Sequence, residues 1–494
     1  MITTGELFPC AERTVILASA GAGKTTKLME LISEELKETD PSRIAFVTFT
    51  RKGVEEGISR LLALHPSLSG DDLDYFRTFH SMCFHALGID YKKLWCPAYE
   101  AILNKAIGSS VHRRYSADHA TYDNRCLDQY DLVRNGGRAD PAITCTPEYK
   151  RLVAAYECVK KRTGAVDFTD CLTKFVEKGE SVPVDVAFID EAQDITDLQW
   201  DVANTAFRSC KKVYIAGDDY QAIFTYAGAN PEVLIQLAKT SECIKLETSH
   251  RIPLKVYRLA KSITDMLSVK EDKDYAPESK REGTVRFLPD LMSLFPYIKA
   301  DLSRSWYILT RNTSFQDSVC AALKTMCIPY FANASFVIPR RDMSLIHRYY
   351  SFRKEGYAGS AEALRFKVDH GIRSFRDDLT ETAMFPFESA ALYQSYIEAY
   401  GEDRLWEMSR GKTKVTVSNI HRVKGGEADN VAVLLDCGRR VEDGIQENQD
   451  TELHTLYVAV TRAKDRLFLV HAEKNGALDD LLEKCLEAAR LRST

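Results

Sequence analysis

A short glycine-rich stretch near the start of the chain carries the residue types that hold a phosphate group. The eight residues from Ala18 to Thr25 read ASAGAGKT and lie between an apolar run and a helical pattern. Glycines in such a turn let backbone N–H groups approach an anion, and the following helix N-terminus adds its dipole. Lys24 then pairs with the β- and γ-phosphates, and the Thr25 hydroxyl binds Mg²⁺. The stretch predicts a nucleoside triphosphate site formed by Ser19, Ala20, Gly21, Ala22, Gly23, Lys24, Thr25 and Thr26.

Two adjacent acidic residues follow another apolar run. Residues 184–189 are apolar apart from Asp185 and lead directly into Asp190 and Glu191. Acidic residues at the carboxyl end of a strand lie where α/β sheets bind ligands. Asp190 can hold Mg²⁺, directly or through water, and Glu191 can orient and deprotonate an attacking water. A chance glycine-rich turn and an exposed acidic loop are the alternatives, but the two features together favour a nucleoside triphosphatase.

These residues need a scaffold that brings strand ends together. Several short runs rich in β-branched and aromatic residues are nearly continuously apolar, as is typical of parallel strands covered on both faces. Helical patterns alternate with them, which predicts a doubly wound α/β fold with parallel sheets. The strand runs are 14–18, 44–50, 184–190, 212–217, 284–288, 306–310, 414–420, 430–436 and 466–471, and the helical patterns include 25–38, 53–64 and 254–267.

Two long segments without clear strands divide this pattern. The first has a helical pattern with basic and aromatic residues interleaved, and the second is charged and rich in Tyr and Phe. We expect two α/β domains, each with one mainly helical inserted subdomain. The expected boundaries are 1–87 and 166–250 for the first domain, 88–165 for its insertion, 251–331 and 413–494 for the second domain, and 332–412 for its insertion.

Composition limits the class of protein. The chain has 494 residues, 45% of them hydrophobic and 28% charged, which is typical of a globular protein with several domains. No apolar run is long enough to cross a bilayer, and no signal peptide pattern is visible. The thirteen cysteines are scattered without a C-x-x-C pair, which indicates reduced thiols. We therefore expect a cytoplasmic protein. The net charge of −5 still permits locally basic faces that contact phosphates, although ordinary solvated faces are the alternative.

Further segments match, in order, the motifs of one helicase family. The sequence resembles the UvrD/Rep-like branch of superfamily 1 helicases. This resemblance implies two RecA-like domains with ATP in the cleft between them and single-stranded nucleic acid across their top. The matching segments are 46–57 (motif Ia), 77–81 (motif Ib), 166–170 (the segment before the acidic strand), 217–229 (motif III), 246–251 (motif IV), 419–427 (motif V) and 456–463 (motif VI).

The resemblance also implies roles for individual residues. Gln221 would sense the γ-phosphate, Arg251 and Arg462 would reach from the second domain as arginine fingers, and Glu427 would contact the ribose. For each arginine alone, a surface salt bridge is the alternative. For Tyr226 it is core packing, and for His80 it is a structural role. The residues expected to contact the nucleic acid strand are Thr48, Arg51, Thr78, His80, Tyr226 and His421, with Tyr226 stacking on a base.

The sequence departs from the family pattern at the base-binding side of the site. No glutamine-containing segment that reads adenine precedes Ala18, and His250 stands where the family has a base-stacking tyrosine. We still expect ATP and Mg²⁺ as cofactors, and a translocase and helicase of 3′→5′ polarity on single-stranded or tailed duplex DNA, with RNA as an open alternative. A nucleotide-switched clamp that binds nucleic acid without processive movement, or a small-molecule kinase, would be the rival functions.

Overall fold

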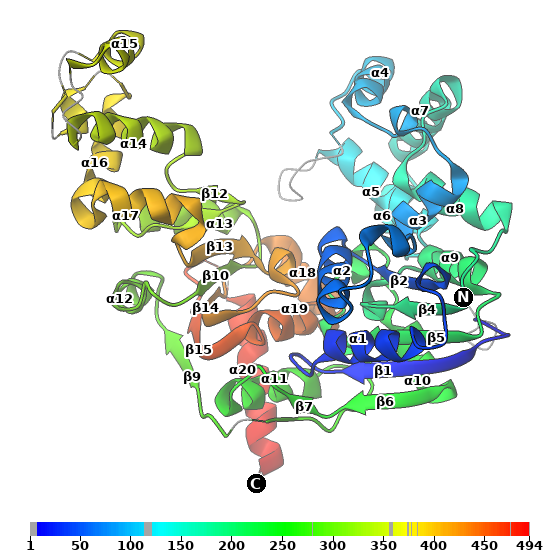
Figure 1. Cartoon of the computed structure of the whole chain (residues 1–494). Coiled ribbons are helices and arrows are strands. Elements are labelled where there is room, and N and C mark those ends of the chain that lie inside the picture. Colours follow the sequence, from blue (N-terminus) through cyan, green and yellow to red (C-terminus); the bar gives the residue numbers. More distant parts are fainter. Residues whose placement is uncertain are drawn as a thin grey trace. The chain divides into compact units, whose positions relative to one another are not determined.

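The computed structural model of the chain contains two compact units (Figure 1). It describes residues 7–112, 121–278, 280–354, 359–372, 375–376, 378–382, 384–474 and 476–493. The first unit comprises Met1–Tyr257, Ile263–Lys280 and Asn448–Val458, and the second comprises Arg258–Ser262, Arg281–Glu447 and Ala459–Thr494. Among the helices of the described residues, none is both long enough and apolar enough to span a membrane.

A six-stranded sheet forms the centre of the first unit. Its strand order is β3-β2-β4-β5-β1-β6 and every pair is parallel, as the sequence predicted. Because parallel strands end at the same edge, the segments that follow Ala18, Thr48, Ile189 and Gly217 come together there. The strands are β1 (Glu12–Ala18), β2 (Ile44–Thr48), β3 (Phe76–Thr78), β4 (Val186–Ile189), β5 (Lys212–Gly217) and β6 (Glu242–Leu246).

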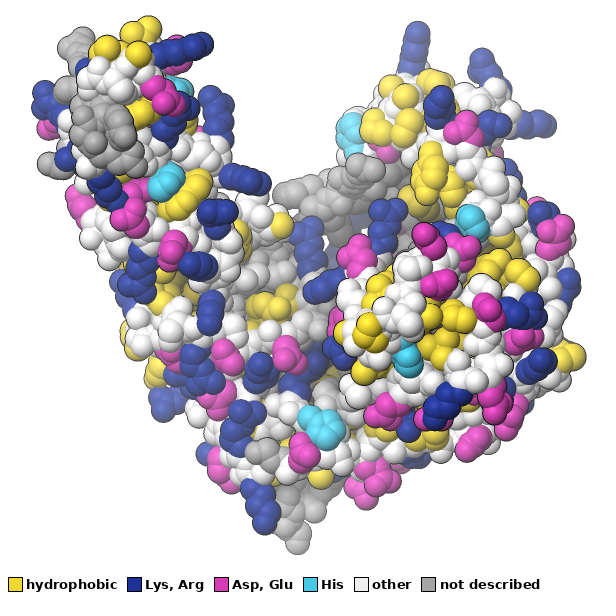
Figure 2. Space-filling view, viewed as in Figure 1, with side chains coloured by type: hydrophobic (Ala, Val, Ile, Leu, Met, Phe, Trp, Pro, Cys, Tyr) yellow, Lys and Arg dark blue, Asp and Glu magenta, His cyan; other side chains and the backbone are white. Residues whose placement is uncertain are grey.

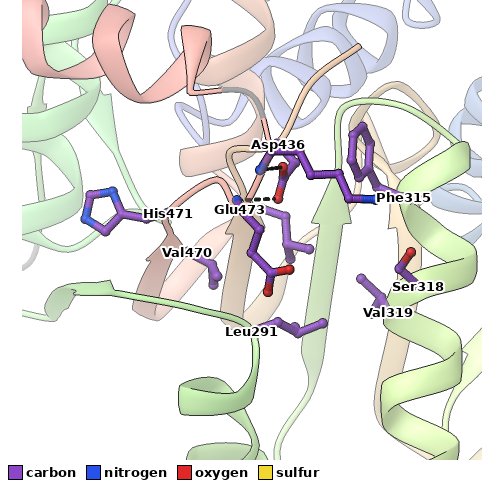
Figure 3. Close-up of a pocket in the computed structure, with 10 residues that line it drawn as sticks. Leu291, Phe315, Ser318, Val319, Asp436, Val470, His471 and Glu473 are labelled. Atoms are coloured by element: carbon purple, nitrogen blue, oxygen red, sulfur yellow. Dashed lines mark hydrogen bonds between the residues drawn. The ribbon is translucent and has the colours of Figure 1, made fainter.

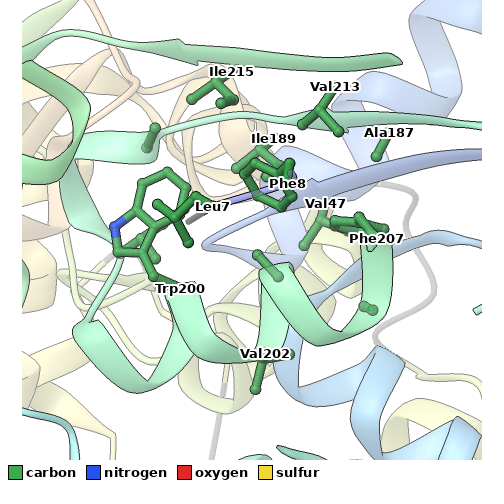
Figure 4. Close-up of a cluster of buried hydrophobic side chains, with 14 of the residues drawn as sticks. Leu7, Phe8, Val47, Ala187, Ile189, Trp200, Val202, Phe207, Val213 and Ile215 are labelled. Carbon is green, nitrogen blue, oxygen red and sulfur yellow. The ribbon is translucent and has the colours of Figure 1, made fainter. Parts of the chain in front are cut away.

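Helices cover both faces of this sheet. Alternate residues of β1 show this, because Val15 and Leu17 belong to one buried cluster and Ile16 to another. The first cluster packs Trp200 and neighbouring side chains against the strands (Figure 4). The second cluster is closed by apolar residues of α1 and α2. The helices are α1 (Lys24–Glu35), α2 (Arg51–Leu64), α3 (Phe79–Leu87), α8 (Phe168–Lys178), α9 (Asp197–Phe207) and α10 (Pro231–Thr240). A further helix, α11 (Leu254–Asp265), is divided between the two units, with Arg258–Ser262 in the second.

The segment from 88 to 165 is helical where it is described, as expected. Its own small core includes Leu103, Leu127 and Tyr156. A buried ion cluster joins it to the start of α8, where Arg134 and Lys160 donate to Asp167 at 2.8 and 2.9 Å. Lys and Arg side chains project from its surface (Figure 2). Its helices are α4 (Pro97–Ile107), α5 (Tyr122–Arg134), α6 (Pro141–Thr144) and α7 (Pro147–Thr163).

The second unit contains a seven-stranded sheet of order β12-β11-β13-β10-β14-β15-β9. All pairs are parallel except the short β11–β12 hairpin. Strand β14 begins two residues earlier than expected, because Ala428 pairs with Ala463 before a register shift. The strands are β9 (Thr284–Leu288), β10 (Trp306–Thr310), β11 (Phe331–Ala332), β12 (Ser335–Phe336), β13 (Val415–Asn419), β14 (Ala428–Leu434) and β15 (Ala463–Val470).

Helices surround this sheet and form the segment from 332 to 412. That segment has a separate aromatic core that includes Tyr349, Phe366 and Tyr396, and it is mainly helical where it is described. Around the sheet lie α12 (Phe295–Ala300), α13 (Ser314–Thr325), α18 (Arg439–Glu447) and α20 (Ala477–Ser493), and the segment contains α14 (Arg340–Lys354), α15 (Ala361–Asp369), α16 (Phe387–Tyr400) and α17 (Glu402–Glu407).

The division into units differs from the expected domain boundaries. Residues 251–257, 263–280 and 448–458, which we expected in the second domain, group with the first unit. Side chains of α19 (Asp450–Val460) give the physical reason. Asp450 accepts hydrogen bonds from the backbone of Ser268, and His454 Nδ1 donates to the carbonyl of Tyr220 at 3.0 Å. These contacts hold part of the motif VI segment on the first unit.

Candidate active site

The predicted phosphate loop joins β1 to α1 in the expected strand-turn-helix arrangement. Gly21 and Gly23 have φ angles of 74° and 80°, in the left-handed region that favours glycine. Gly23 caps α1 without a side chain, so the first N–H groups of the helix point toward the space before it. The Ser19 hydroxyl is buried and makes no hydrogen bond to any described residue. This loop has the backbone geometry and a spare polar group that suit a bound phosphate.

Lys24 pairs with both the predicted metal ligand, Asp190, and the predicted general base, Glu191. Its ammonium nitrogen lies 2.9 Å from Asp190 Oδ1 and 2.7 Å from Glu191 Oε1. Burial alone would lower the pKa of Lys24, but the two carboxylates outweigh burial and raise it, so the side chain stays charged. Two carboxylates against one ammonium leave an excess negative charge. A divalent cation suits that excess, and Asp190 with Thr25 in the first turn of α1 would hold Mg²⁺.

Glu191 is held in a fixed orientation by its neighbours. Its φ of 56° is in the left-handed region, an uncommon conformation for a residue with a side chain. Gln193 Nε2 donates to Glu191 Oε2 at 2.6 Å, and Gln193 Oε1 accepts from the backbone N–H of Asp218 at 2.9 Å. Gln221 Nε2 donates to the carboxylate of Asp218 at 2.6 Å. The structure therefore joins Gln221 to the acidic pair through Gln193 and Asp218, two residues that sequence reasoning missed.

The motif IV segment lies directly on the phosphate loop. The Ser249 hydroxyl donates to the carbonyl of Ala20 at 2.6 Å, and the backbone N–H of His250 donates to the carbonyl of Gly21 at 2.9 Å. A Cβ on Gly21 would lie 2.4 Å from the Cβ of Arg251. We expected Arg251 to belong to the second domain, but it lies in the same unit as the loop, where these backbone hydrogen bonds hold it. His250 Nδ1 lies 2.7 Å from Glu278 Oε2.

A tyrosine of motif VI also touches the phosphate loop. The backbone N–H of Ala20 donates to the hydroxyl of Tyr457 at 3.2 Å. Burial raises the pKa of Tyr457, so its hydroxyl stays protonated and remains a donor as well as an acceptor. The hydroxyl of Tyr275 lies 3.4 Å away. Motif VI contains Tyr457 by sequence, but nothing in the sequence indicated that it contacts the loop.

Within the second unit, motifs V and VI meet at Arg462. This arginine is buried, and its guanidinium donates to the carbonyl of Gly426 at 3.1 Å and to the Thr461 hydroxyl at 3.0 Å. Glu427 is exposed, with its carboxylate 3.4 Å from Lys464 Nζ. His421 lies beyond β13, where its backbone N–H donates to the Asn419 side chain at 2.8 Å. The three predicted residues of this unit therefore lie in two adjoining loops and at the end of a strand.

The predicted strand-contacting residues of the first unit follow the ends of two paired strands. Thr48 and Thr78 are register partners at the ends of β2 and β3. Thr48 is buried, and the Thr78 hydroxyl caps α3 by accepting from the N–H of Ser81 at 3.3 Å. Arg51 is exposed at the start of α2. The sheet therefore brings motifs Ia and Ib together, with Arg51 as one exposed positive charge.

Two aromatic side chains near this edge are exposed. Tyr226 is 61% exposed, which rules out core packing as its role. Its ring lies 6.2 Å from that of Phe224. Phe168 is 59% exposed and meets His80 edge to face at 5.6 Å; sequence reasoning did not single it out. Burial lowers the pKa of His80 to about 4, so this side chain is neutral at neutral pH. His80 therefore offers a ring and a polar nitrogen, without a positive charge.

Family models match the two regions that carry these motifs. Residues 6–242 match the UvrD/REP helicase N-terminal domain, and residues 414–470 match the UvrD-like helicase C-terminal domain. The chain belongs to the UvrD/Rep-like family of superfamily 1 helicases. The first matched region contains the phosphate loop, the acidic pair and Gln221, and the second contains Glu427 and Arg462.

Curated UvrD/Rep-like relatives cover part of the chain. An ATP-dependent DNA helicase PcrA of Leuconostoc citreum is 25% identical over 262 residues, which are 48% of this chain and 35% of that protein. A probable DNA helicase II homolog of Mycoplasma capricolum is 26% identical over 280 residues, 51% of this chain and 38% of that protein. The PcrA of Staphylococcus aureus is 25% identical over 264 residues, 48% of this chain and 36% of that protein. The matched part thus spans little more than a third of these relatives.

One pocket of this UvrD/Rep-like chain lies apart from the predicted site. It lies at the carboxyl ends of β14 and β15 in the second unit (Figure 3). Asp436 in its wall accepts hydrogen bonds from the backbone N–H groups of Glu473 and Lys474 at 3.2 and 3.0 Å. No predicted site residue lines it. The pocket is therefore not part of the predicted nucleotide or nucleic-acid site.

Proposed function

We propose that the chain is an ATP-dependent translocase and helicase that moves along single-stranded DNA with 3′→5′ polarity. Two RecA-like domains, each with a helical insertion, would carry this activity. The observation that carries the proposal is the position of Lys24 between Asp190 and Glu191, with Gln221 linked to Glu191 through Asp218 and Gln193. The curated relatives are named as ATP-dependent DNA helicases, which supports DNA and ATP as the substrates of this chain.

The proposed reaction is hydrolysis of ATP at the phosphate loop. Lys24 leaves the carboxylates and pairs with the β- and γ-phosphates. Thr25 and Asp190 would hold Mg²⁺, which when bound would supply positive charge against the phosphate oxygens. Glu191 accepts a proton from the attacking water, and Gln221 contacts the γ-phosphate. Arg251 lies beside the loop, and Arg462 would be supplied by the second unit, so that both stabilise the transition state.

In this proposal the base and the sugar of the nucleotide contact fewer residues than its phosphates do. The His250 ring takes the place of the family tyrosine, and a Cβ on Gly23 would lie 3.9 Å from His250 Cδ2, so the ring borders the phosphate loop. Glu427 would contact the ribose. Because His250 stands where the family has a base-stacking tyrosine, we expect discrimination between ATP and GTP to be weak. Competition between the two nucleotides measures this directly.

The proposed strand path follows the carboxyl edges of the sheets. Tyr226 provides an exposed ring for stacking, Phe168 with His80 provides a second aromatic point, and Arg51 provides positive charge. Stacking tolerates any base because every base has a π-face. Thr48, Thr78 and His421 would contact the strand close by. Opening and closing of the nucleotide cleft would change the grip of these groups on the strand.

Steady-state ATPase and unwinding assays test the proposal. We expect hydrolysis to rise several-fold with single-stranded DNA and unwinding of duplexes with a 3′ tail. Duplexes with 5′ tails and matched RNA strands provide the controls. A single slow turnover without stimulation would indicate a nucleotide-switched clamp, and a preference for 5′ tails would contradict the polarity.

A further inference from the structure

A buried lysine outside the matching motifs lies under the phosphate loop. The side chain of Lys273 is 3% exposed. Its ammonium nitrogen lies 2.5 Å from Asp218 Oδ1 and 2.6 Å from Asp219 Oδ1, and it donates to the carbonyl of Ala18 at 3.0 Å. The ammonium group thus donates hydrogen bonds to Ala18 and Asp218 and forms an ion pair with Asp219. The same nitrogen lies 3.8 Å from the centre of the Tyr220 ring.

This arrangement keeps the lysine charged. Burial alone would lower the pKa of Lys273, but Asp218 and Asp219 outweigh it and raise the pKa. Removing the ammonium would leave two buried carboxylates beside each other without a cation, which is costly. The charge of Lys273 therefore stabilises the turn that contains Asp218 and Asp219.

Asp218 connects this lysine to the predicted catalytic groups. Its Oδ1 contacts Lys273, while its Oδ2 accepts from Gln221 Nε2 at 2.6 Å. Its backbone N–H donates to Gln193, whose amide in turn donates to Glu191 at 2.6 Å. Any displacement of Asp218 would therefore move Gln221, which is expected to contact the γ-phosphate. It would also move Gln193, which donates to the expected general base, Glu191.

The backbone around Lys273 is held in place without its ammonium group. The backbone N–H of Glu271 donates to Asp219 Oδ2 at 2.8 Å, and the Tyr220 hydroxyl donates to the carbonyl of Glu271 at 3.1 Å. The backbone N–H of Lys273 donates to the same hydroxyl at 3.3 Å. A neutral side chain at position 273 should therefore leave the path of this segment unchanged, so its effect on the reaction can be measured in folded protein.

We propose that Lys273 is a positioning residue for ATP hydrolysis: it fixes Asp218 against the carbonyl at the start of the phosphate loop, and so sets Gln221 and Glu191. This inference rests on the proposed ATPase function. Lys273 itself contacts none of the groups expected to touch the phosphates. Its effect should therefore appear in kcat rather than in the affinity for ATP.

Four variants separate positioning from stability. Lys273→Met should lower kcat about 10- to 100-fold and change KM for ATP less than about 3-fold, since a small misplacement of catalytic groups costs that much. Lys273→Arg keeps the charge and should recover part of kcat. The double variant Lys273→Met with Asp219→Asn removes one buried negative charge along with the lysine, so its Tm should rise above that of Lys273→Met while kcat stays low. Lys245→Met is the matched control, because Lys245 donates to Glu271 and to the carbonyl of Asp272, on the same segment as Lys273, rather than to Asp218. Its kcat should match wild type.

Two outcomes would overturn the proposal: kcat that recovers together with Tm in the double variant, or a folded Lys273→Met protein with wild-type kcat. Hydrogen–deuterium exchange in the absence of nucleotide tests, separately from hydrolysis, whether Lys273 holds Asp218 in place. Residues 217–223 should exchange faster in the double variant than in Lys245→Met. Equal exchange would show that Lys273 does not fix the turn that contains Asp218. A wild-type protein without ATPase activity would instead refute the proposed function, while the exchange comparison still decides whether Lys273 holds Asp218.

Discussion

The ammonium nitrogen of Lys24 lies 2.9 Å from Oδ1 of Asp190, so the expected phosphate-binding cation is paired with the expected metal ligand. Phosphate oxygens and carboxylate oxygens are alternative partners for the same ammonium group. A nucleotide that enters the loop must therefore take Lys24 from Asp190, and a divalent cation must then compensate the carboxylate that is left. This exchange links nucleotide binding to metal binding at one buried position.

Replacing Asp190 by Asn tests that exchange. Because the variant loses a competitor for Lys24, a fluorescent ATP analogue should bind more tightly than to wild type in the presence of EDTA. Mg²⁺-dependent hydrolysis should fall at least about 100-fold, because the variant also loses a metal ligand. Asp201→Asn, on an exposed position of α9, should leave both quantities unchanged. Metal-free affinity that is equal or weaker in Asp190→Asn would show that the ion pair does not compete with the nucleotide.

The phosphate loop should not tolerate a side chain at Gly21. A Cβ there would lie 2.4 Å from the Cβ of Arg251, and the φ of 74° already disfavours alanine. We expect Gly21→Ala to lower the free energy of unfolding by about 1–3 kcal/mol and to weaken nucleotide binding. Gly70→Ala is the control, because a Cβ at that position meets nothing within 4 Å. Equal melting temperatures for the two variants would contradict the close packing of motif IV on the loop.

His80 should make stability depend on pH. Its pKa is about 4 in the folded protein, below the value of about 6.5 in an unfolded chain, because burial disfavours the charged form. Between these values the unfolded state binds more protons, so the stabilisation is complete above pH 6.5 and is lost as the pH falls toward 4. From pH 7.5 to 5, wild type should lose about 1–2 kcal/mol more than His80→Gln, after allowance for partial exposure. Urea unfolding midpoints measure the difference, and parallel pH profiles would contradict the buried neutral state.

Tyr226 should contribute to strand binding through stacking. Tyr226→Ala should weaken binding of single-stranded DNA by about 1–3 kcal/mol, with similar losses for oligo(dT) and mixed sequences. Its ATPase rate without DNA should stay close to wild type, since the ring has no expected contact with the nucleotide. Phe387→Ala removes another exposed ring, 74% exposed in the second unit, and serves as the control. Fluorescence anisotropy with labelled strands measures the DNA affinity of both variants. Equal affinities would show that Tyr226 does not contact the strand.

Local sequence patterns were enough to predict the strongest elements of the fold. Strands β5 and β10 match the predicted runs residue for residue, because strands buried in a parallel sheet read as short apolar runs. Strand β9 also matches its predicted run, although it is an edge strand in which only Leu288 is buried. The edge strand β6 was missed, since its residues are only partly buried and give no such run. Strand β3 has only three residues, too few to show a period.

The site was predictable where its residues are close in sequence. The loop around Lys24 and the pair Asp190–Glu191 were found because a turn and a strand end determine them locally. Tyr457 contacts Ala20 across 437 residues of sequence, and Lys273 contacts Asp218 across 55. Such pairs depend on how distant elements pack, so no local pattern indicated them. Arg251 was assigned to the wrong unit for the same reason.

The most direct test is the ATPase rate of wild type and Lys24→Ala, each with and without single-stranded DNA. We expect the wild-type rate to rise several-fold with DNA. The Lys24→Ala rate should be at least about 100-fold below the wild-type rate under each condition. Folding of the variant can be checked by its melting temperature. A correctly folded Lys24→Ala protein that hydrolyses ATP at the wild-type rate would contradict the assignment of the active site.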